Sequence, residues 1–302
     1  MLKSFRAWTL FLAALGCLQA QGGPSWTWTR MEGEVTRLAD AVEGRVGVFI
    51  QSLDTGESFA LRADEVFPAA STIKLALLLE LYRQCERPGP RLTDPYLLDP
   101  RDLAEDSAIL GNLAPGTRLT LRDLALFTVV VSDNSATNIL MDRVGMDRVN
   151  AGLDALGLRR TRLRRKMMDA QAAREGRENL ATPRELAGLL LEIHRGRTLA
   201  PESRCDLMKL LAIPKDSYLA RLLPDGLAVA DKTGSLPGVR NDVGIVFVKN
   251  RPFVVAVMAS HLRDDREGEA VIGRIARSAA AWMELAGAAS AEGRVNGTLQ
   301  VR

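Results

Sequence analysis

The chain has 302 residues, of which 47% are hydrophobic and 25% charged, which corresponds to about two ordinary domain lengths of globular sequence. These values exclude a disordered tail protein and a small disulfide scaffold. The 40 Lys and Arg exceed the 37 Asp and Glu by only three charges. Such an excess does not supply the wide positive field on which sequence-independent nucleic-acid binding depends, so no nucleic-acid partner is expected.

Residues 1–20 predict an export signal. Lys3 and Arg6 precede an apolar run from Ala7 to Leu18, and Ala20 ends a small-residue cleavage site. The run is shorter than the roughly 20 residues that span a bilayer. Its removal leaves 38 basic and 37 acidic residues, so the mature protein is expected to be exported to the periplasm or the medium and to be nearly neutral.

A second interpretation of this leader is a lipid anchor. Ala14-Leu15-Gly16-Cys17 is similar to a lipoprotein cleavage box, which would leave a lipidated Cys17 at the mature N-terminus. Simple secretion is preferred because Ala14 stands where that box usually has leucine. No later stretch is long and apolar enough to predict a transmembrane helix.

Hydrophobic periodicity predicts regular elements mainly near the two ends of the mature chain. They are a helix over 31–43, strands over 45–51, 58–61, 227–232, 243–248 and 253–259, and a closing helix over 271–285. From Ser71 to about Arg204 the patterns are helical, with no convincing strand. This distribution predicts an α+β fold in which terminal helices flank a five-stranded antiparallel sheet and an all-helical domain is inserted between strands.

The predicted domain boundaries follow from this distribution. Segments 28–68 and 205–286 form the α/β domain, 69–204 the helical domain, and 287–302 a small, polar tail that is expected to be poorly ordered. A cleft between two such lobes is the usual place for a site. A monomer is expected.

The cysteines and histidines do not predict a metal site. Cys85 and Cys205 remain after leader removal, and the sequence does not say whether they pair; two buried free thiols are the preferred interpretation. The two histidines, His194 and His261, have no Cys/His ligand spacing around them. Neither a metal nor an organic cofactor is therefore expected.

The first chemical motif is Ser71-Thr72-Ile73-Lys74, which opens a strongly apolar helical stretch. Residues three apart lie on one helix face, so the Ser71 hydroxyl and the Lys74 amine should be neighbours. A buried amine must be paired or shifted towards neutrality, and a neutral amine can take the proton of a serine. Alone, this spacing also fits a capping serine and a snorkelling lysine.

Two further motifs stand later in the chain. Ser132-Asp133-Asn134 ends an apolar run and precedes another helical stretch, where such residues also act as helix caps. Asp231-Lys232-Thr233-Gly234 ends a strand-like run. In this order the three motifs resemble those of the class A β-lactamase family, within the serine β-lactamase and penicillin-binding superfamily, and the resemblance extends over about residues 31–285.

The resemblance implies a role for each motif residue. Ser71 would attack a lactam or amide carbonyl with the help of Lys74, Ser132 would pass a proton to the leaving nitrogen, and Asn134 would hold the substrate amide. Lys232, Thr233 and Gly234 would receive the substrate carboxylate and let the substrate lie along the strand. The backbone N–H groups of Ser71 and Ser235 would form the oxyanion hole, and Arg240 would be a further carboxylate anchor, although an exposed strand-end arginine fits it equally well.

The sequence departs from the family in the loop that carries the deacylating glutamate. Counted without gaps from Thr161, the glutamate position falls on Met167 and the accompanying asparagine position on Gln171. Methionine cannot accept a proton. A divergent member that lacks the usual loop glutamate is therefore expected, with Asp169 as the nearest carboxylate.

Three functional outcomes stay open at this point. Asp169 could reach the water, which gives a β-lactamase of altered efficiency. Acylation could outpace hydrolysis, which gives a penicillin-binding receptor. The substrate could instead be a peptidoglycan-like peptide or ester, which gives a D-alanyl-D-alanine peptidase or esterase that uses Lys74 in both half-reactions.

The same loop is strongly basic, with six positive residues in eight positions. They are Arg159, Arg160, Arg162, Arg164, Arg165 and Lys166. The preferred interpretation is a solvated run in which Arg165 pairs with Glu178 and pins the loop. The alternative is a positive wall that attracts carboxylate-bearing substrates.

Overall fold

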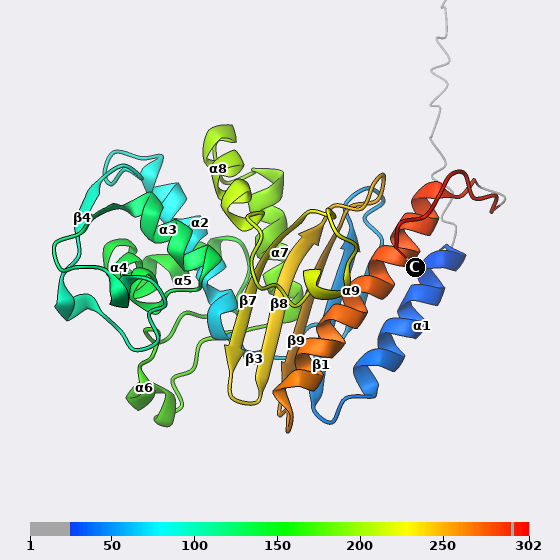
Figure 1. Ribbon diagram of the computed structural model, residues 1–302, viewed down its shortest axis with the longest axis horizontal. Coiled ribbons are helices and arrows are strands. Elements are labelled where there is room, and N and C mark those ends of the chain that lie inside the picture. The colour runs from blue at the N-terminus through cyan, green and yellow to red at the C-terminus, as the bar shows by residue number, and fades with distance from the viewer. Residues whose placement is uncertain (1–24, 291–292, 302) are drawn as a thin grey trace, which may run out of the picture.

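The computed structural model describes residues 25–290 and 293–301 (Figure 1). The predicted leader, including Cys17, lies outside the described residues. Among the helices of the described part, none is long and apolar enough to cross a membrane.

One antiparallel sheet organises the molecule. Its strands, in spatial order, are β2 (Ser58–Leu61), β1 (Arg45–Ser52), β9 (Phe253–Ser260), β8 (Val239–Val246) and β7 (Val229–Leu236). This confirms the predicted five-stranded sheet and the α+β class. The bounds of β7 and β8 differ from prediction, because β7 continues through Lys232 to Leu236 and β8 begins at Val239. Polar residues interrupt the apolar pattern there, so hydropathy alone does not mark these strand ends.

Two terminal helices cover one face of the sheet. α1 (Trp26–Asp40) and α9 (Asp265–Ala288) lie side by side on it and enclose an apolar core that includes Val35, Val255 and Ile275 (Figure 1). The chain after α9, predicted to be poorly ordered, lies against this helix where it is described. Val301 is buried, and its N–H donates to Glu284 at 2.7 Å.

Helices cover the other face and extend beyond it (Figure 1). They are α2 (Lys74–Cys85), α3 (Leu121–Val130), α4 (Asn134–Val144), α5 (Met146–Ala155), α6 (Ala170–Arg174), α7 (Pro183–Arg195) and α8 (Pro201–Leu211). Helix α2 is buried among its neighbours, as its apolar sequence predicts. Helix α7 contacts β1, β8 and β9 as well as α2, so one apolar core runs from the helices onto the sheet. The division into segments 28–68, 69–204 and 205–286 stays a prediction.

The helical region also contains two short strand pairs, which the sequence did not predict. β3 (Phe67–Pro68) pairs with β6 (Leu180–Ala181), and β4 (Pro95–Leu97) pairs with β5 (Arg118–Thr120). Two or three residues are too few to show an alternating pattern.

The two cysteines are free thiols in the structure. Cys85 is half-buried at the end of α2, whereas Cys205 is exposed on α8. The expectation of two buried thiols is therefore wrong: Cys85 is only half-buried, and Cys205 faces solvent because α8 buries only its other side.

Candidate active site

Ser71 lies in a short 3-10 turn, η1 (Ala70–Ile73), between β3 and α2. The turn packs against the edge strand β7. A Cβ atom on Gly234 would come within 2.9 Å of the backbone nitrogens of Ser71 and Thr72, which is closer than real Cβ contacts. Only glycine lets the strand approach the turn this closely. Ala70, directly before the serine, has a φ of 48°, a strained conformation of the kind found at functional sites.

Lys74 is fully buried one helical turn after Ser71. Its Nζ donates to the carbonyl oxygen of Ser132 at 2.6 Å and to Oδ1 of Asn134 at 3.2 Å, and it lies 3.1 Å from the Ser132 Oγ. Burial, with the nearby charge of Lys232, lowers the pKa of Lys74 well below its ordinary value. Burial in the helix therefore shifts this amine towards its neutral, proton-accepting form.

Ser132 and Asn134 come from the loop between α3 and α4. Ser132 has a φ of 55°, and the buried Asp133 next to it fixes the loop. The carboxylate of Asp133 accepts from the N–H of Ala136 at 2.9 Å, which caps α4, and from the N–H of Ile109 at 2.9 Å. Asp133 therefore has the capping role that the residue types suggested. Its neighbours Ser132 and Asn134 contact Lys74 instead.

Lys232 lies in the middle of β7 and is also buried. Its Nζ lies 3.1 Å from the Ser132 Oγ and donates to the Thr233 carbonyl oxygen at 2.9 Å. Burial lowers the pKa of Lys232 to about 8, although Asp231 and Asp242 partly offset this effect. The Ser132 hydroxyl therefore joins the two lysines that the sequence places 158 positions apart.

A cleft of about 420 Å³ opens in front of these residues. Its lining includes Ser71, Asn134 and Ser235, together with Leu236 at the end of β7 and Pro237 directly after it. The predicted nucleophile therefore shares one cavity with Asn134 and Ser235.

Arg240 lies on β8 as the cross-strand neighbour of Ser235 and is half-buried. Its Nε donates to Glu269 at 2.9 Å, and its Nη2 lies 3.1 Å from Asp265. Both carboxylates belong to α9. Arg240 is therefore not the exposed strand-end arginine that the sequence also allowed, and two acidic partners already hold its guanidinium.

The loop that follows α5 forms the opposite wall of the cleft. Met167, Met168 and Asp169 all line the cavity. Met167 is 8% exposed, and the side chain of Asn138 holds its backbone, accepting from the Met167 N–H at 2.8 Å and donating to its carbonyl oxygen at 3.1 Å. The residue that the gap-free count places at the glutamate position does line the same cavity as Ser71.

Asp169 and Gln171, the other two loop residues that the sequence singled out, have different surroundings. Asp169 caps α6, since its Oδ1 accepts from the N–H of Ala172 at 2.9 Å. Gln171 does not line the cleft; it is exposed on α6 and donates to Glu175 at 3.0 Å. The short helix that begins at Ala170 turns this side chain away, so the structure does not bring Gln171 to Met167.

The expected pairing of Arg165 with Glu178 is present. The guanidinium donates to both carboxylate oxygens at 3.0 Å, and the Arg165 side chain is only 8% exposed. Two other basic residues of the loop are also paired, Arg162 with Asp154 and Lys166 with Asp142. Half of the positive run is therefore neutralised locally.

The structure adds two residues that the sequence reasoning missed. Asn138 lies one helical turn after Asn134 on α4, a spacing that places both on one face, and Asp106, with a φ of 54°, lines the cleft beside Asn134. The helical spacing could have indicated Asn138. Asp106 lies in an irregular loop that has no periodic signal.

The fold is the β-lactamase/transpeptidase-like fold, and the arrangement around Ser71 places the protein in the class of serine hydrolases with this fold. A family model described as the Beta-lactamase enzyme family matches residues 30–283. The chain belongs to that family, and its relatives are class A β-lactamases.

Individual relatives agree with this assignment. The chain is 28% identical to β-lactamase SME-1 of Serratia marcescens over 82% of this chain and 86% of the relative. It is 34% identical to a β-lactamase of Amycolatopsis lactamdurans over 76% and 77%.

Solved structures also resemble it. The crystal structure of a β-lactamase from Sphaerobacter thermophilus is 36% identical and superposes with a TM-score of 0.79 over 84% of this chain and 97% of that one. The structure of PBP-A is 28% identical with a TM-score of 0.76, over 83% and 95%. A leucine-to-glutamate mutant of PBP-A is described as an acyl-enzyme complex with penicillin G.

Proposed function

We propose that the protein is a serine hydrolase that opens β-lactams, or related cell-wall amides, through an acyl-enzyme on Ser71. The observation that carries this proposal is the buried Lys74 amine with its lowered pKa, one turn from Ser71 and in contact with Ser132 and Asn134. The names of the relatives supply the substrate class.

The first half-reaction follows from the contacts of Lys74. A neutral amine has two N–H donors and one lone pair, and the Ser132 carbonyl and the Asn134 side chain take the two donors. The lone pair, which the Ser132 Oγ faces at 3.1 Å, would take the Ser71 proton and pass it on to this hydroxyl. Ser71 Oγ bonds to the lactam carbon, and when the C–N bond breaks, the nitrogen takes a proton through the Ser132 hydroxyl.

The strand β7 would bind the substrate. Lys232 supplies a positive charge and Thr233 a hydroxyl for the substrate carboxylate. Arg240, the cross-strand neighbour of Ser235, adds little net charge there, because Glu269 and Asp265 already hold its guanidinium. As β7 is an edge strand that pairs with β8 on one side only, the sheet does not use the backbone groups on its outer side. The N–H groups of Ser71 and Ser235 would then stabilise the oxyanion.

A specific observation favours a second function, that of a receptor that acylates and hydrolyses slowly. Met167, which cannot accept a proton, occupies the cleft wall, and Asp169 already uses one oxygen to cap α6. General-base assistance is typically worth about 10² to 10⁴ in rate. Its loss slows hydrolysis without preventing acylation. The penicillin G acyl-enzyme described for the PBP-A mutant shows that a related protein can be acylated by a β-lactam.

One experiment distinguishes the two functions. Purified protein is mixed with a chromogenic cephalosporin and followed by absorbance and by intact mass. Many turnovers support a β-lactamase, and one equivalent with a stable adduct on Ser71 supports the receptor. Absence of both adduct and turnover would contradict both proposals, and Ser71→Ala provides the blank.

The cellular setting is also a proposal. The predicted leader supports export, with lipid anchoring through Cys17 as the alternative, and a monomer acting on a small β-lactam or peptidoglycan-like substrate is consistent with a cleft built from one chain. Metabolic labelling with palmitate in a bacterial host would distinguish the two forms of the N-terminus.

A further inference from the structure

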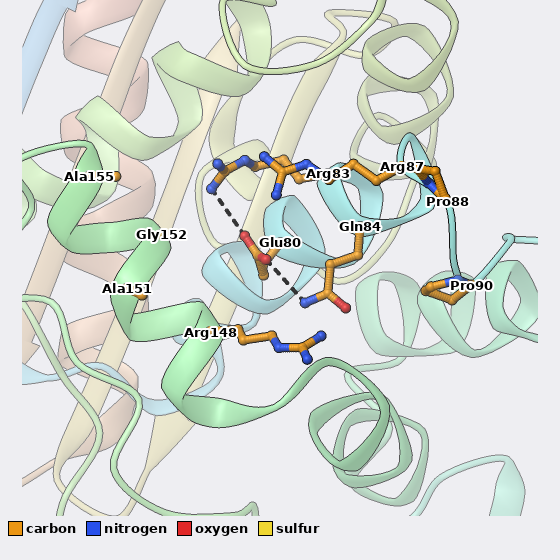
Figure 2. A pocket seen from close by; sticks show the side chains of 10 residues that line it. All are labelled: Glu80, Arg83, Gln84, Arg87, Pro88, Pro90, Arg148, Ala151, Gly152 and Ala155. Atoms are coloured by element: carbon orange, nitrogen blue, oxygen red, sulfur yellow. Dashed lines mark hydrogen bonds and ion pairs between the residues drawn. The ribbon is translucent and has the colours of Figure 1, made fainter.

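A second cavity lies between helices α2 and α5, away from Ser71. It has a volume of about 360 Å³, and Figure 2 shows the side chains that line it. The last turns of α2 form one side, the segment Arg87 to Pro90 the rim, and α5 the other side. Because α2 begins at Lys74, Arg83 lies nine residues, or about 13 Å of helix, beyond the catalytic lysine.

The charges of this groove do not balance. Arg83, Arg87 and Arg148 line it, and Glu80 is the one carboxylate among the lining residues. Glu80 is already used: it accepts from Arg83 at 3.1 Å and from the Gln84 amide at 3.1 Å. The guanidinium groups of Arg87 and Arg148 have no hydrogen-bond or ion-pair partner among the described residues, although both backbone N–H groups are bonded. The groove therefore presents two guanidinium groups that no carboxylate of the fold satisfies.

Other acidic residues nearby do not correct this imbalance. Glu86 precedes Arg87 but accepts from the N–H of Ala200 at 2.8 Å, and Asp147 precedes Arg148 but is not part of the lining. Neither is positioned to neutralise the groove from within.

The floor of the groove has a specific shape. Gly152 lies inside α5, where glycine is less favourable than alanine by about 1 kcal/mol. A Cβ atom there would come within 3.1 Å of both Arg83 Nη1 and Glu80 Oε2. Gly152 thus makes room for the Arg83–Glu80 ion pair against α5. The short side chains of Ala151 and Ala155 leave space in the groove beside it. Figure 2 shows the Arg83–Glu80–Gln84 network between Arg148 on one side and Arg87 on the other.

We propose that this groove binds a small ligand with two neighbouring anionic groups, a diphosphate or a dicarboxylate. Arg87 and Arg148 would each donate to one anionic group, because a guanidinium presents paired N–H donors that match carboxylate and phosphate oxygens. The Arg83–Glu80 pair would fix the floor, and the small residues of α5 would leave space for a short linker. The site is separate from the β-lactam cleft and does not depend on the function proposed for it.

The test is isothermal titration of the full mature chain at low ionic strength with pyrophosphate and, separately, with citrate. We expect saturable one-to-one binding of at least one of them. Each of Arg87→Ala and Arg148→Ala should weaken this binding about tenfold, the usual effect of losing one charge-assisted hydrogen-bonded contact. The preference between the two anions identifies phosphate or carboxylate as the recognised chemistry.

The matched control is Arg274→Ala, which removes an exposed arginine from α9 on the opposite side of the sheet. It should change the affinity less than twofold, and Arg148→Lys should retain part of it. Cephalosporin acylation and circular dichroism should be unchanged in all four variants, which shows that they fold. Absence of saturable binding by either anion, or equal weakening by Arg274→Ala, would overturn the proposal.

Discussion

At the scale of single residues, Lys232 gives the proposed mechanism a pH dependence. Burial lowers the pKa of Lys232 to about 8, so its positive charge is present below that pH and is lost above it. The acylation rate constant, kcat/KM, should therefore fall above about pH 8 for a substrate that carries a carboxylate. Lys232→Arg should move this fall to higher pH, since arginine remains charged. The measurement is kcat/KM for acylation between pH 5 and 10.

The test compares the pH at which kcat/KM falls and not the absolute value of kcat/KM, because Lys232→Arg also changes the contact with Ser132. The rising limb reports the deprotonation of Lys74, whose pKa is lowered, and should stay in place. A descending limb that remains near pH 8 in Lys232→Arg would assign it to another group.

Met167 gives a second prediction at this scale. Asn138 holds the Met167 backbone, so a new side chain there should enter the same part of the cleft. Met167→Glu should raise the rate of deacylation by about 10² to 10⁴, the usual range for a general base. The measurement is the lifetime of the adduct by intact mass. Met168→Glu, next to it and 40% exposed, is the control and should have little effect. An unchanged lifetime in Met167→Glu would mean that the loop cannot place a carboxylate on the water.

These residues show what the sequence could and could not predict. The neighbourhood of Ser71 and Lys74 follows from helical spacing, and Ser132 and Lys232 were added by resemblance, since only the folded chain brings them to Lys74. The direction of Gln171 was not predictable by counting, because it depends on where α6 begins. The ion pairs of Arg240 depend on α9, which packs on β8 from a distant part of the chain.

At the scale of elements, the loop after α5 is held by one well-shielded ion pair. Arg165→Ala would leave Glu178 without its bidentate partner, and we expect a loss of roughly 2 kcal/mol of unfolding free energy, between typical surface and buried values. Hydrogen exchange should become faster in residues 166–178. Lys166→Ala, which removes an exposed pair with Asp142, is the control and should change stability by less than about 1 kcal/mol. Equal effects of the two variants would argue against this pinning role.

The strands β7 and β8 bury a pair of carboxylates behind the site. Asp231 pairs with Lys215 at 2.9 Å, and Asp242 accepts from the Leu219 N–H at 3.0 Å, while Asp242 Oδ1 is buried without a partner. Burial, together with the charge of Asp231, raises the pKa of Asp242 well above its ordinary value. Between about pH 4, where the unfolded chain releases this proton, and the raised pKa of Asp242, the native state binds more proton than the unfolded chain, so this group lowers stability as the pH rises through that range.

Asp242→Asn should remove that dependence and keep the acceptor for Leu219. We expect the variant to be more stable than the wild type, with a gain that grows from pH 4 towards neutrality at no more than about 1.4 kcal/mol per pH unit. Urea unfolding at several pH values measures it, with the exposed Asp225→Asn as the control. A gain that does not change with pH would show that Asp242 is ionised in the native state.

The element scale also explains how far the fold was predictable. The two hairpin strands near the N-terminus and the strand over 253–259 have continuous apolar or alternating patterns, so they were predicted almost to their ends. The stretch from Lys232 to Asp242 hides the ends of β7 and β8, because its polar side chains interrupt the apolar pattern. The short pairs β3–β6 and β4–β5 depend on the packing of segments far apart in the chain.

At the scale of the whole molecule, the charge distribution decides between the two interpretations of the basic loop. The six positive charges of residues 159–166 exceed the net charge of the mature chain, which has 38 basic and 37 acidic residues. Three of the six, however, have an acidic partner: Arg162, Arg165 and Lys166. Only Arg165 of the six lines the cleft, and Glu178 neutralises it. We therefore expect little long-range attraction of substrate, and kcat/KM for acylation by a carboxylate-bearing cephalosporin should fall less than about threefold between 20 and 500 mM NaCl. The methyl ester of the same cephalosporin provides the comparison. A tenfold fall in kcat/KM for the acid but not for the ester would instead support the interpretation of the loop as a positive wall that attracts substrate. Arg159 and Arg164 would then be the residues to neutralise.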